Sequence, residues 1–294
     1  MALTLMLGSA LACLSFPVLI SGDRDGQARV QRVELDGPIA APVSLPEGAF
    51  RVMSLNLAHG RADGRFQALR KRETLEANLA AAGALVRSWR PHAVALQEAD
   101  AASVWSGRFD HVSAVARAAG LPWAVHSPHV SGAGLHYGTG ALTWTQPSAT
   151  RQRTFAPSPP TMSKGATLVR FATPEGQEIT LVSVHLDFAR AKVRQRQARV
   201  LAGWLANQQG PIVLVGDFNC QWGDREDTLR GLAEALGLRA YQPDSAALAT
   251  YPGWGKRLDW VLISPDLEFT NYRVLPEVVS DHRAVVADLR LVER

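Results

Sequence analysis

Residues 211–219 read Pro-Ile-Val-Leu-Val-Gly-Asp-Phe-Asn. The apolar run at 212–215 predicts a strand buried on both faces, and Gly216 lets the backbone turn out of the sheet where that strand ends. Asp217 and Asn219 are two positions apart, so in extended backbone both side chains leave the strand on the same side. A carboxylate beside an amide on a rigid strand can hold and activate a water molecule. Gly, Asp and Asn also favour turns, so the stretch is equally compatible with an ordinary strand ending.

The composition is that of an ordinary globular protein. The chain has 294 residues, 47% of them hydrophobic and 20% charged, which suffices for a large buried core. The formal net charge is only +4, which is weak evidence for binding to nucleic acid, lipid headgroups or any other anion. Cys13 lies in an apolar leader and Cys220 in the central motif, so neither a structural disulfide nor a zinc site is predicted.

The first 22 residues differ from the rest of the chain. Residues 1–22 carry no charged side chain and are mostly apolar, which is typical of a signal peptide or a membrane anchor. Ala10-Leu11-Ala12 resembles a cleavage site, and Cys13 after it is an alternative lipidation site. We therefore expect an exported or membrane-anchored protein that associates with membranes, if at all, through residues 1–22. Residues 23–48 lack periodicity and predict a linker, and the folded domain is expected at 49–294.

Apolar periodicity predicts strands alternating with a few helices along this domain. Besides the central strand, strands are expected at 50–57, 93–96, 123–126, 140–145, 166–173, 178–185, 258–263 and 284–291. Helices are expected at 75–89, 110–120, 193–205 and 227–236. The interior strands are apolar on both faces or nearly so, which favours an α/β fold of two stacked sheets with helices outside. A Gly-rich loop is expected around His129, His136 and Tyr137, and these side chains are candidates to line a pocket.

Polar side chains that can do chemistry recur at the ends of these strands. They are Asn56, Glu98, His185, Asp217, Asn219, Asp259, Asp281 and His282. Each one alone is a common strand-end residue that faces water, but the ordered recurrence of carboxylates, amides and imidazoles at successive strand ends is rare by chance. The sequence therefore predicts one catalytic site where these strand ends meet.

Six short motifs carry a family resemblance. They are Ser-Leu-Asn-Leu, Leu-Gln-Glu, Val-His-Leu-Asp, Gly-Asp-Phe-Asn, Arg-Leu-Asp-Trp and Ser-Asp-His-Arg. Together they make the chain resemble the endonuclease/exonuclease/phosphatase superfamily of DNase I-like, metal-dependent phosphohydrolases, over residues 49–292. The resemblance implies a four-layer α/β/β/α sandwich of two packed mixed sheets, with one site at one edge of both sheets.

The resemblance also implies a divalent cation, Mg²⁺ or alternatively Mn²⁺. Cleavage of a phosphodiester needs a hard cation to offset the charge of the phosphoryl oxygens, an aligned water and a group that stabilises the leaving oxygen. Glu98 is the expected main ligand, with Asn56 and Asp281 supplying oxygen atoms directly or through water, because Mg²⁺ keeps several waters and needs few carboxylates.

The remaining strand-end residues are assigned catalytic roles on the same basis. Asp217 is expected to orient and deprotonate the attacking water, and Asn219 to fix that water or a phosphate oxygen. His282 is expected to donate to the phosphoryl oxygen, with Asp259 setting the orientation of its imidazole. His185 occupies the position where family members place a His or Tyr that contacts the phosphate.

The sequence constrains the type of reaction more closely than the identity of the substrate. Candidate substrate-binding residues are Arg194, Tyr137, Trp222 and Trp254. Ala99-Asp100 stands where abasic-site repair enzymes carry a Lys after the Gln-Glu pair, which argues against that branch. We expect a monomeric phosphodiesterase acting on a phospholipid headgroup or another small phosphodiester. The alternatives are an exported non-specific nuclease and a catalytically inactive phosphate-binding module of the same fold.

Overall fold

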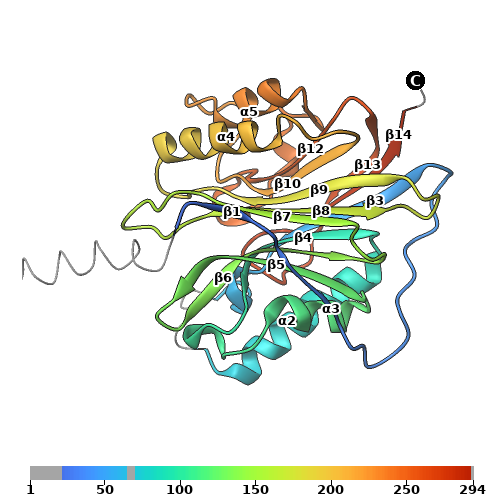
Figure 1. Ribbon diagram of the computed structural model, residues 1–294, viewed down its shortest axis with the longest axis vertical. Helices are drawn as coiled ribbons and strands as arrows, with labels where there is room; N and C mark the ends of the chain where they lie inside the picture. Colours follow the sequence, from blue (N-terminus) through green and yellow to red (C-terminus); the bar gives the residue numbers. More distant parts are fainter. Residues whose placement is uncertain (1–21, 65–69, 293–294) are drawn as a thin grey trace, which may run out of the picture.

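Two mixed sheets packed face to face form the centre of the molecule, with helices on both outer sides (Figure 1). The structure is a computed structural model that describes residues 22–64 and 70–292. The four layers expected from the sequence are therefore confirmed. A core of buried apolar side chains fills the space between the sheets, where the rings of Phe50 and Phe171 meet edge to face at 6.2 Å.

The first sheet contains the central strand. Its seven strands, in spatial order, are β1 (Arg24–Gly26), β7 (Ala149–Thr154), β8 (Gly165–Ala172), β9 (Glu178–His185), β10 (Ile212–Asp217), β12 (Asp259–Ile263) and β11 (Arg239–Ala240). Strand β10 runs parallel to β9 and antiparallel to β12. The outer face of this sheet is covered by α4 (Ala191–Leu205) and α5 (Thr228–Leu236) (Figure 1).

The second sheet contains the strands that end at Asn56 and Asp100. Its seven strands, in spatial order, are β13 (Leu267–Val274), β14 (Val285–Leu291), β3 (Ala49–Asn56), β4 (Ala93–Asp100), β6 (Leu135–Thr143), β5 (Trp123–Gly132) and β2 (Arg29–Arg32). Its outer face is covered by α2 (Arg72–Trp89) and α3 (His111–Ala119). Helix α3 begins and ends as expected, because the Asp110 carboxylate accepts the Ser113 N–H and Gly120 adopts left-handed backbone.

The central strand ends where Gly216 predicts it should. Every residue of β10 is buried, as its continuous apolar run requires. Gly216 has φ 143°, and a Cβ at this position would lie 2.1 Å from the carbonyl oxygen of Val184 on the neighbouring strand. Only glycine fits this close approach, which lets the chain deliver Asp217 to the sheet edge.

Two local expectations differ from the structure. Part of the expected linker at 23–48 forms β1 and β2, which add a strand to the edge of each sheet by pairing with β7 and β5. Edge pairing uses backbone hydrogen bonds and needs no apolar period, so the sequence pattern does not reveal it. The expected Gly-rich loop is also wrong, since His129 lies on β5 and His136 and Tyr137 lie on β6 of a long hairpin.

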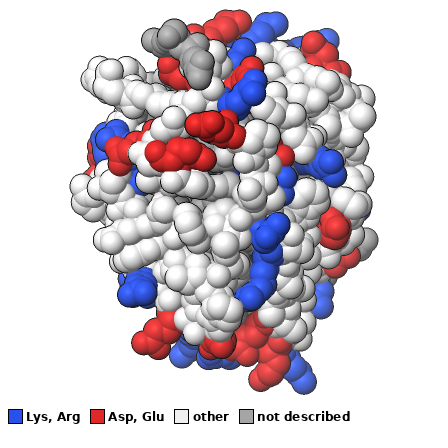
Figure 2. Space-filling model, turned by 90° about the vertical axis from the view of Figure 1, so that its right-hand side faces the viewer, with Lys and Arg blue, Asp and Glu red and all other residues white. Residues whose placement is uncertain are grey.

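The N-terminal expectation is not tested by the fold. The signal peptide or anchor predicted at 1–22 lies outside the described residues except for Gly22. No helix within residues 22–64 and 70–292 is long and apolar enough to cross a membrane. The face of the molecule drawn in Figure 2 carries basic and acidic side chains together, separated by uncharged surface.

Candidate active site

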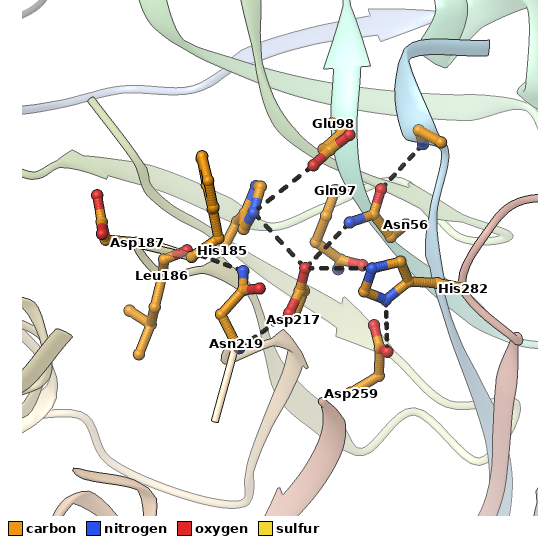
Figure 3. Close-up of polar contacts among 12 residues, drawn as sticks. Asn56, Gln97, Glu98, His185, Leu186, Asp187, Asp217, Asn219, Asp259 and His282 are labelled. Carbon is orange, nitrogen blue, oxygen red and sulfur yellow. Dashed lines mark hydrogen bonds and ion pairs between the residues drawn. The ribbon is translucent and has the colours of Figure 1, made fainter. Parts of the chain in front are cut away.

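The predicted strand-end residues meet at one edge of the two sheets (Figure 3). Strand register explains why: Asp217 on β10 is directly paired with His185 on β9 and with Asp259 on β12. The second sheet brings Asn56 at the end of β3 to the same edge, where its Nδ2 donates to Asp217 Oδ2 at 3.1 Å. Segments more than 160 residues apart in sequence thus build one buried polar cluster.

Asp217 lies at the centre of this cluster. Its Oδ1 accepts the backbone N–H of Asn219 at 2.9 Å, and its Oδ2 lies 3.6 Å from His185 Nε2 and 3.9 Å from His282 Nε2. Burial raises the pKa of Asp217, and the nearby carboxylates of Asp259 and Glu98 raise it further against the opposing effect of His282. A carboxylate with a raised pKa in a buried site is suited to accept a proton from water.

His282 and Asp259 form a buried pair. The Nδ1 of His282 lies 2.7 Å from Asp259 Oδ2, and the Tyr251 ring packs edge-on against the imidazole at 4.9 Å. Burial alone would lower the pKa of His282, but the carboxylates of Asp259 and Asp217 raise it to about 10. The pKa of His185 is shifted in the opposite direction: burial and the nearby ammonium of Lys164 hold it well below the usual value. The site therefore pairs a protonated imidazole with a neutral one.

Glu98 approaches the cluster from a bulge in β4. The pairing of β4 with β6 shifts register between Leu96 and Ala99, and Glu98 in between has left-handed backbone with φ 48°. Its Oε1 lies 3.9 Å from His185 Nε2 and its Oε2 lies 3.5 Å from His59 Nε2. Burial would raise the pKa of Glu98, but the nearby positive charges of His59, Lys164 and Arg61 hold it well below its usual range. The carboxylate is therefore ionised and available to a cation.

A pocket of about 500 Å³ opens onto these residues. Glu98, Asp217, Asn219 and His282 line its polar side. The remaining lining side chains include cations and aromatic rings: Arg61, Arg194, Lys256, Phe188, Tyr251 and Trp254. The two large aromatic side chains Phe188 and Trp254 are 62% and 71% exposed, respectively. The pocket thus combines charged groups with aromatic surface at its margin.

The four candidate substrate-binding residues divide into two groups. Arg194 and Trp254 line the pocket. Trp222 does not line it, since it packs against Trp260 beside a neighbouring depression. Tyr137 is buried with its ring edge-on to that of His59, 4.9 Å away, also outside the pocket lining. Arg194 is largely immobilised, because its Nη1 donates to the carbonyl oxygens of Asp187 and Phe188.

Two assigned residues make contacts that the sequence did not suggest. Asp281 Oδ2 pairs with Arg61 Nη2 at 2.8 Å, so as a metal ligand it would share its carboxylate with a guanidinium. The Asn219 side chain donates to the carbonyl oxygen of Leu186 at 3.1 Å, while its backbone N–H holds Asp217. These contacts make Asn219 a residue that positions the Asp217 carboxylate.

Sequence analysis missed three polar groups at this edge. Arg61 lines the pocket, and a basic residue five positions after Asn56 was its only signal. Lys164 is 92% buried, and its charge acts on both Glu98 and His185. Asp100 anchors His59 through a 2.6 Å contact. Their side chains reach the site through tertiary packing, which no local pattern encodes.

The donor set fits a divalent cation. Glu98 presents an ionised carboxylate to the pocket, and Asn56 Oδ1 keeps a lone pair beyond the one that accepts the Ala58 N–H. Among the described residues, Asp217, Asp259 and His282 also offer ligand atoms within 4.8 Å of one another. That second group is already joined internally by the short Asp259–His282 contact, which favours proton chemistry there and metal binding at Glu98.

Comparison with known proteins assigns the chain to a family. The sequence profile of the Endonuclease/Exonuclease/phosphatase family matches residues 53–282, a span that contains the whole polar cluster. The chain belongs to the endonuclease/exonuclease/phosphatase family. The resemblance inferred from the six motifs is thereby confirmed.

Individual relatives of this family member are distant. UPF0294 protein YE0917 of Yersinia enterocolitica is 27% identical over 133 residues, which make up 44% of this chain and 49% of the relative. The chain thus spans about half the length of the curated relatives it matches.

Solved structures show the shared fold. An endonuclease/exonuclease/phosphatase from Beutenbergia cavernae superposes with TM-score 0.60 at 17% identity, covering 83% of this chain and 72% of the other. The human Nocturnin catalytic domain with bound sulfate superposes with TM-score 0.58 at 17% identity, covering 90% and 97%. At this level of identity, the two structures support the fold of this family member and say nothing of its substrate.

Proposed function

We propose that this family member is a phosphodiesterase that requires a divalent cation, Mg²⁺ or Mn²⁺, and cleaves a phosphodiester by direct attack of water on phosphorus. The observation that carries the proposal is the convergence of Asp217, His185, His282 and Glu98 on one pocket, with the proton-accepting carboxylate between two imidazoles in opposite protonation states. This set supplies a base, an acid and a cation ligand within one buried cluster.

The geometry supports the following reaction. Asp217 accepts a proton as the water oxygen forms its bond to phosphorus, and the bond from phosphorus to the leaving oxygen breaks as that oxygen takes a proton from solvent water. His282, held by Asp259, donates its Nε2 proton to the phosphoryl group as negative charge develops there. Glu98 and Asn56 would hold a divalent cation, which would neutralise charge on the phosphoryl oxygens.

A small substrate is favoured over a polymer. The charged groups of the site lie inside a pocket of about 500 Å³, a volume that suits a small phosphoester. Phe188 and Trp254 add exposed aromatic surface at the pocket. A phospholipid headgroup or another small phosphodiester therefore suits the site. We further propose that the protein is a monomer and that residues 1–22 export it or attach it to a membrane.

A panel of phosphoesters tests the function. Protein lacking residues 1–22 should hydrolyse bis-p-nitrophenyl phosphate with Mg²⁺ or Mn²⁺ and lose that activity in EDTA. Comparison of phospholipid, small diester, DNA and RNA substrates assigns the class: steep salt-dependent activity on both nucleic acids would instead support an exported nuclease. Inertness toward every substrate, with an unchanged result in Asp217→Asn, would leave only a phosphate-binding module.

A further inference from the structure

A buried histidine and aspartate lie directly behind Glu98. His59 belongs to the short helical turn η1 (Ala58–Gly60) that follows β3, and its backbone is left-handed with φ 52°. Asp100 is the last residue of β4 and is fully buried. Its Oδ2 lies 2.6 Å from His59 Nδ1, so the carboxylate fixes that side of the imidazole. A left-handed non-glycine residue costs conformational energy and needs support from its surroundings.

The rest of the surroundings fixes the imidazole plane. The indole Nε1 of Trp105 donates to Asp100 Oδ1 at 2.9 Å, which holds the carboxylate in turn. The ring of Tyr137 lies nearly perpendicular to that of His59 at 4.9 Å, and the Trp105 ring lies 5.4 Å away. Tyr137, expected from the sequence to meet substrate, is instead part of this support. The histidine is thus oriented by one carboxylate and two aromatic rings.

This orientation directs the second imidazole nitrogen at Glu98. His59 Nε2 lies 3.5 Å from Glu98 Oε2. With the Nδ1 proton directed at Asp100, a metal ion that displaces the proton on Nε2 meets the ring lone pair at that nitrogen. Two donor atoms that each bind one ion at about 2.1 Å lie roughly 3.0–3.5 Å apart, so the observed separation suits a shared ion. A carboxylate on the far nitrogen is also the usual support of a metal-binding histidine.

We propose that His59 Nε2 and Glu98 Oε2 bind the same divalent ion, and that this nitrogen donor makes the site prefer a transition metal such as Co²⁺ or Zn²⁺ to Mg²⁺. Imidazole favours these ions, whereas Mg²⁺ prefers all-oxygen sites. The inference rests on the proposed function, since it adds a ligand to the same metal position. Asp100 then acts as the positioning residue of His59, and the oxygen donors of Asn56 and water complete the coordination.

Co²⁺ is the probe of choice because its binding is visible by optical absorption and shifts the proton resonances of a bound imidazole. Titration of the full chain should show Co²⁺ binding tighter than Mg²⁺. His59→Gln should weaken the binding of Co²⁺ by about 10–100-fold and the binding of Mg²⁺ by less than about threefold. His136→Gln, which alters a partly exposed histidine bonded to Ser131, is the matched control and should change neither. Asp100→Asn should also weaken the binding of Co²⁺ more than the binding of Mg²⁺, as His59→Gln does.

Proton NMR of the Co²⁺ protein adds a readout on the wild type itself, which stays informative if a variant is unstable. The wild type should show a strongly shifted, exchangeable Nδ1–H signal that disappears in His59→Gln. Absence of such a signal in the wild type would overturn the inference, as would equal loss of Co²⁺ and Mg²⁺ affinity in His59→Gln. Hydrolysis is measured separately. If activity requires a divalent cation but His59→Gln leaves Co²⁺ affinity unchanged, this inference is refuted and the proposed function stands. Co²⁺ bound through His59 without any hydrolysis refutes the proposed function alone.

Discussion

The Asp259–His282 pair gives the sharpest quantitative test of the catalytic assignment. Replacing Asp259 by Asn keeps the size of the side chain but removes the charge that lies 2.7 Å from His282 Nδ1. In the native site, burial acts to lower the pKa of His282, while Asp259 and Asp217 raise it to about 10. Loss of the Asp259 charge should therefore lower this pKa, because the imidazolium loses its nearest stabilising partner.

The expected size follows from the interaction that is lost. A hydrogen bond to a charged group contributes about 1.5–3 kcal/mol, and 1.36 kcal/mol corresponds to one pH unit, so the pKa of His282 should fall by about 1 to 2. A fall of this size from about 10 leaves the imidazole mostly protonated at neutral pH, so the main effect is that the acid is less well oriented. The value of kcat should fall by about 10²–10⁴-fold, the range that a positioned acid or base contributes.

NMR titration of histidine-labelled protein in EDTA measures this directly. The chain has eight histidines, and the signal of His282 is assigned by its absence in His282→Gln. Asp224→Asn is the matched control, because Asp224 lines the same pocket but bonds the backbone of Gln221. If Asp259→Asn lowers the pKa of His282 no more than Asp224→Asn does, the two residues do not act as a pair and the assignment fails.

Three further outcomes follow from the structure. Glu98→Gln should weaken divalent-cation binding at least about tenfold with little change in thermal stability, measured by calorimetric titration; unchanged affinity would place the ion elsewhere. Lys164→Met should lower kcat/KM by about 10–100-fold, because the buried ammonium places a positive charge beside Glu98 and His185; a change confined to melting temperature would make it structural. Burial lowers the pKa of His92 to about 4. As the pH falls, His92 therefore becomes protonated near pH 6.5 in the unfolded chain but only near pH 4 in the folded chain. Folding stability should therefore fall by about 2 kcal/mol between pH 6.5 and 4.5 from this group, a loss that His92→Asn should abolish in urea denaturation; an identical pH dependence in both proteins would contradict it.

The sequence predicted the interior of the fold better than its edges. Strands such as β10 and β9 are buried on both faces, so their apolar runs are unambiguous. Strand β7, Ala-Thr-Arg-Gln-Arg-Thr, was missed because its mostly polar residues lie near the sheet edge, where pairing with β1 and β8 relies on the backbone. The end of β4 was also missed, since the bulge at Glu98 interrupts the pairing pattern.

The site was predictable to the extent that it lies at strand ends. Asp217 and His282 could be assigned because the end of an apolar strand marks the sheet edge where their side chains emerge. The Arg61–Asp281 ion pair joins residues 220 positions apart, and the His59–Asp100 contact depends on a left-handed turn. Such contacts arise only once the two sheets are packed, so no local pattern in the sequence signals them.

In the proposed reaction, water activated by Asp217 attacks phosphorus at this edge of the sheets. The most direct measurement is hydrolysis of a phosphodiester in ¹⁸O-labelled water, with mass spectrometry of the products. We predict one ¹⁸O atom in the phosphate-containing product, formation of that product only when a divalent cation is present, and loss of the product in Asp217→Asn. Label in the alcohol product, or full turnover by Asp217→Asn, would contradict the account.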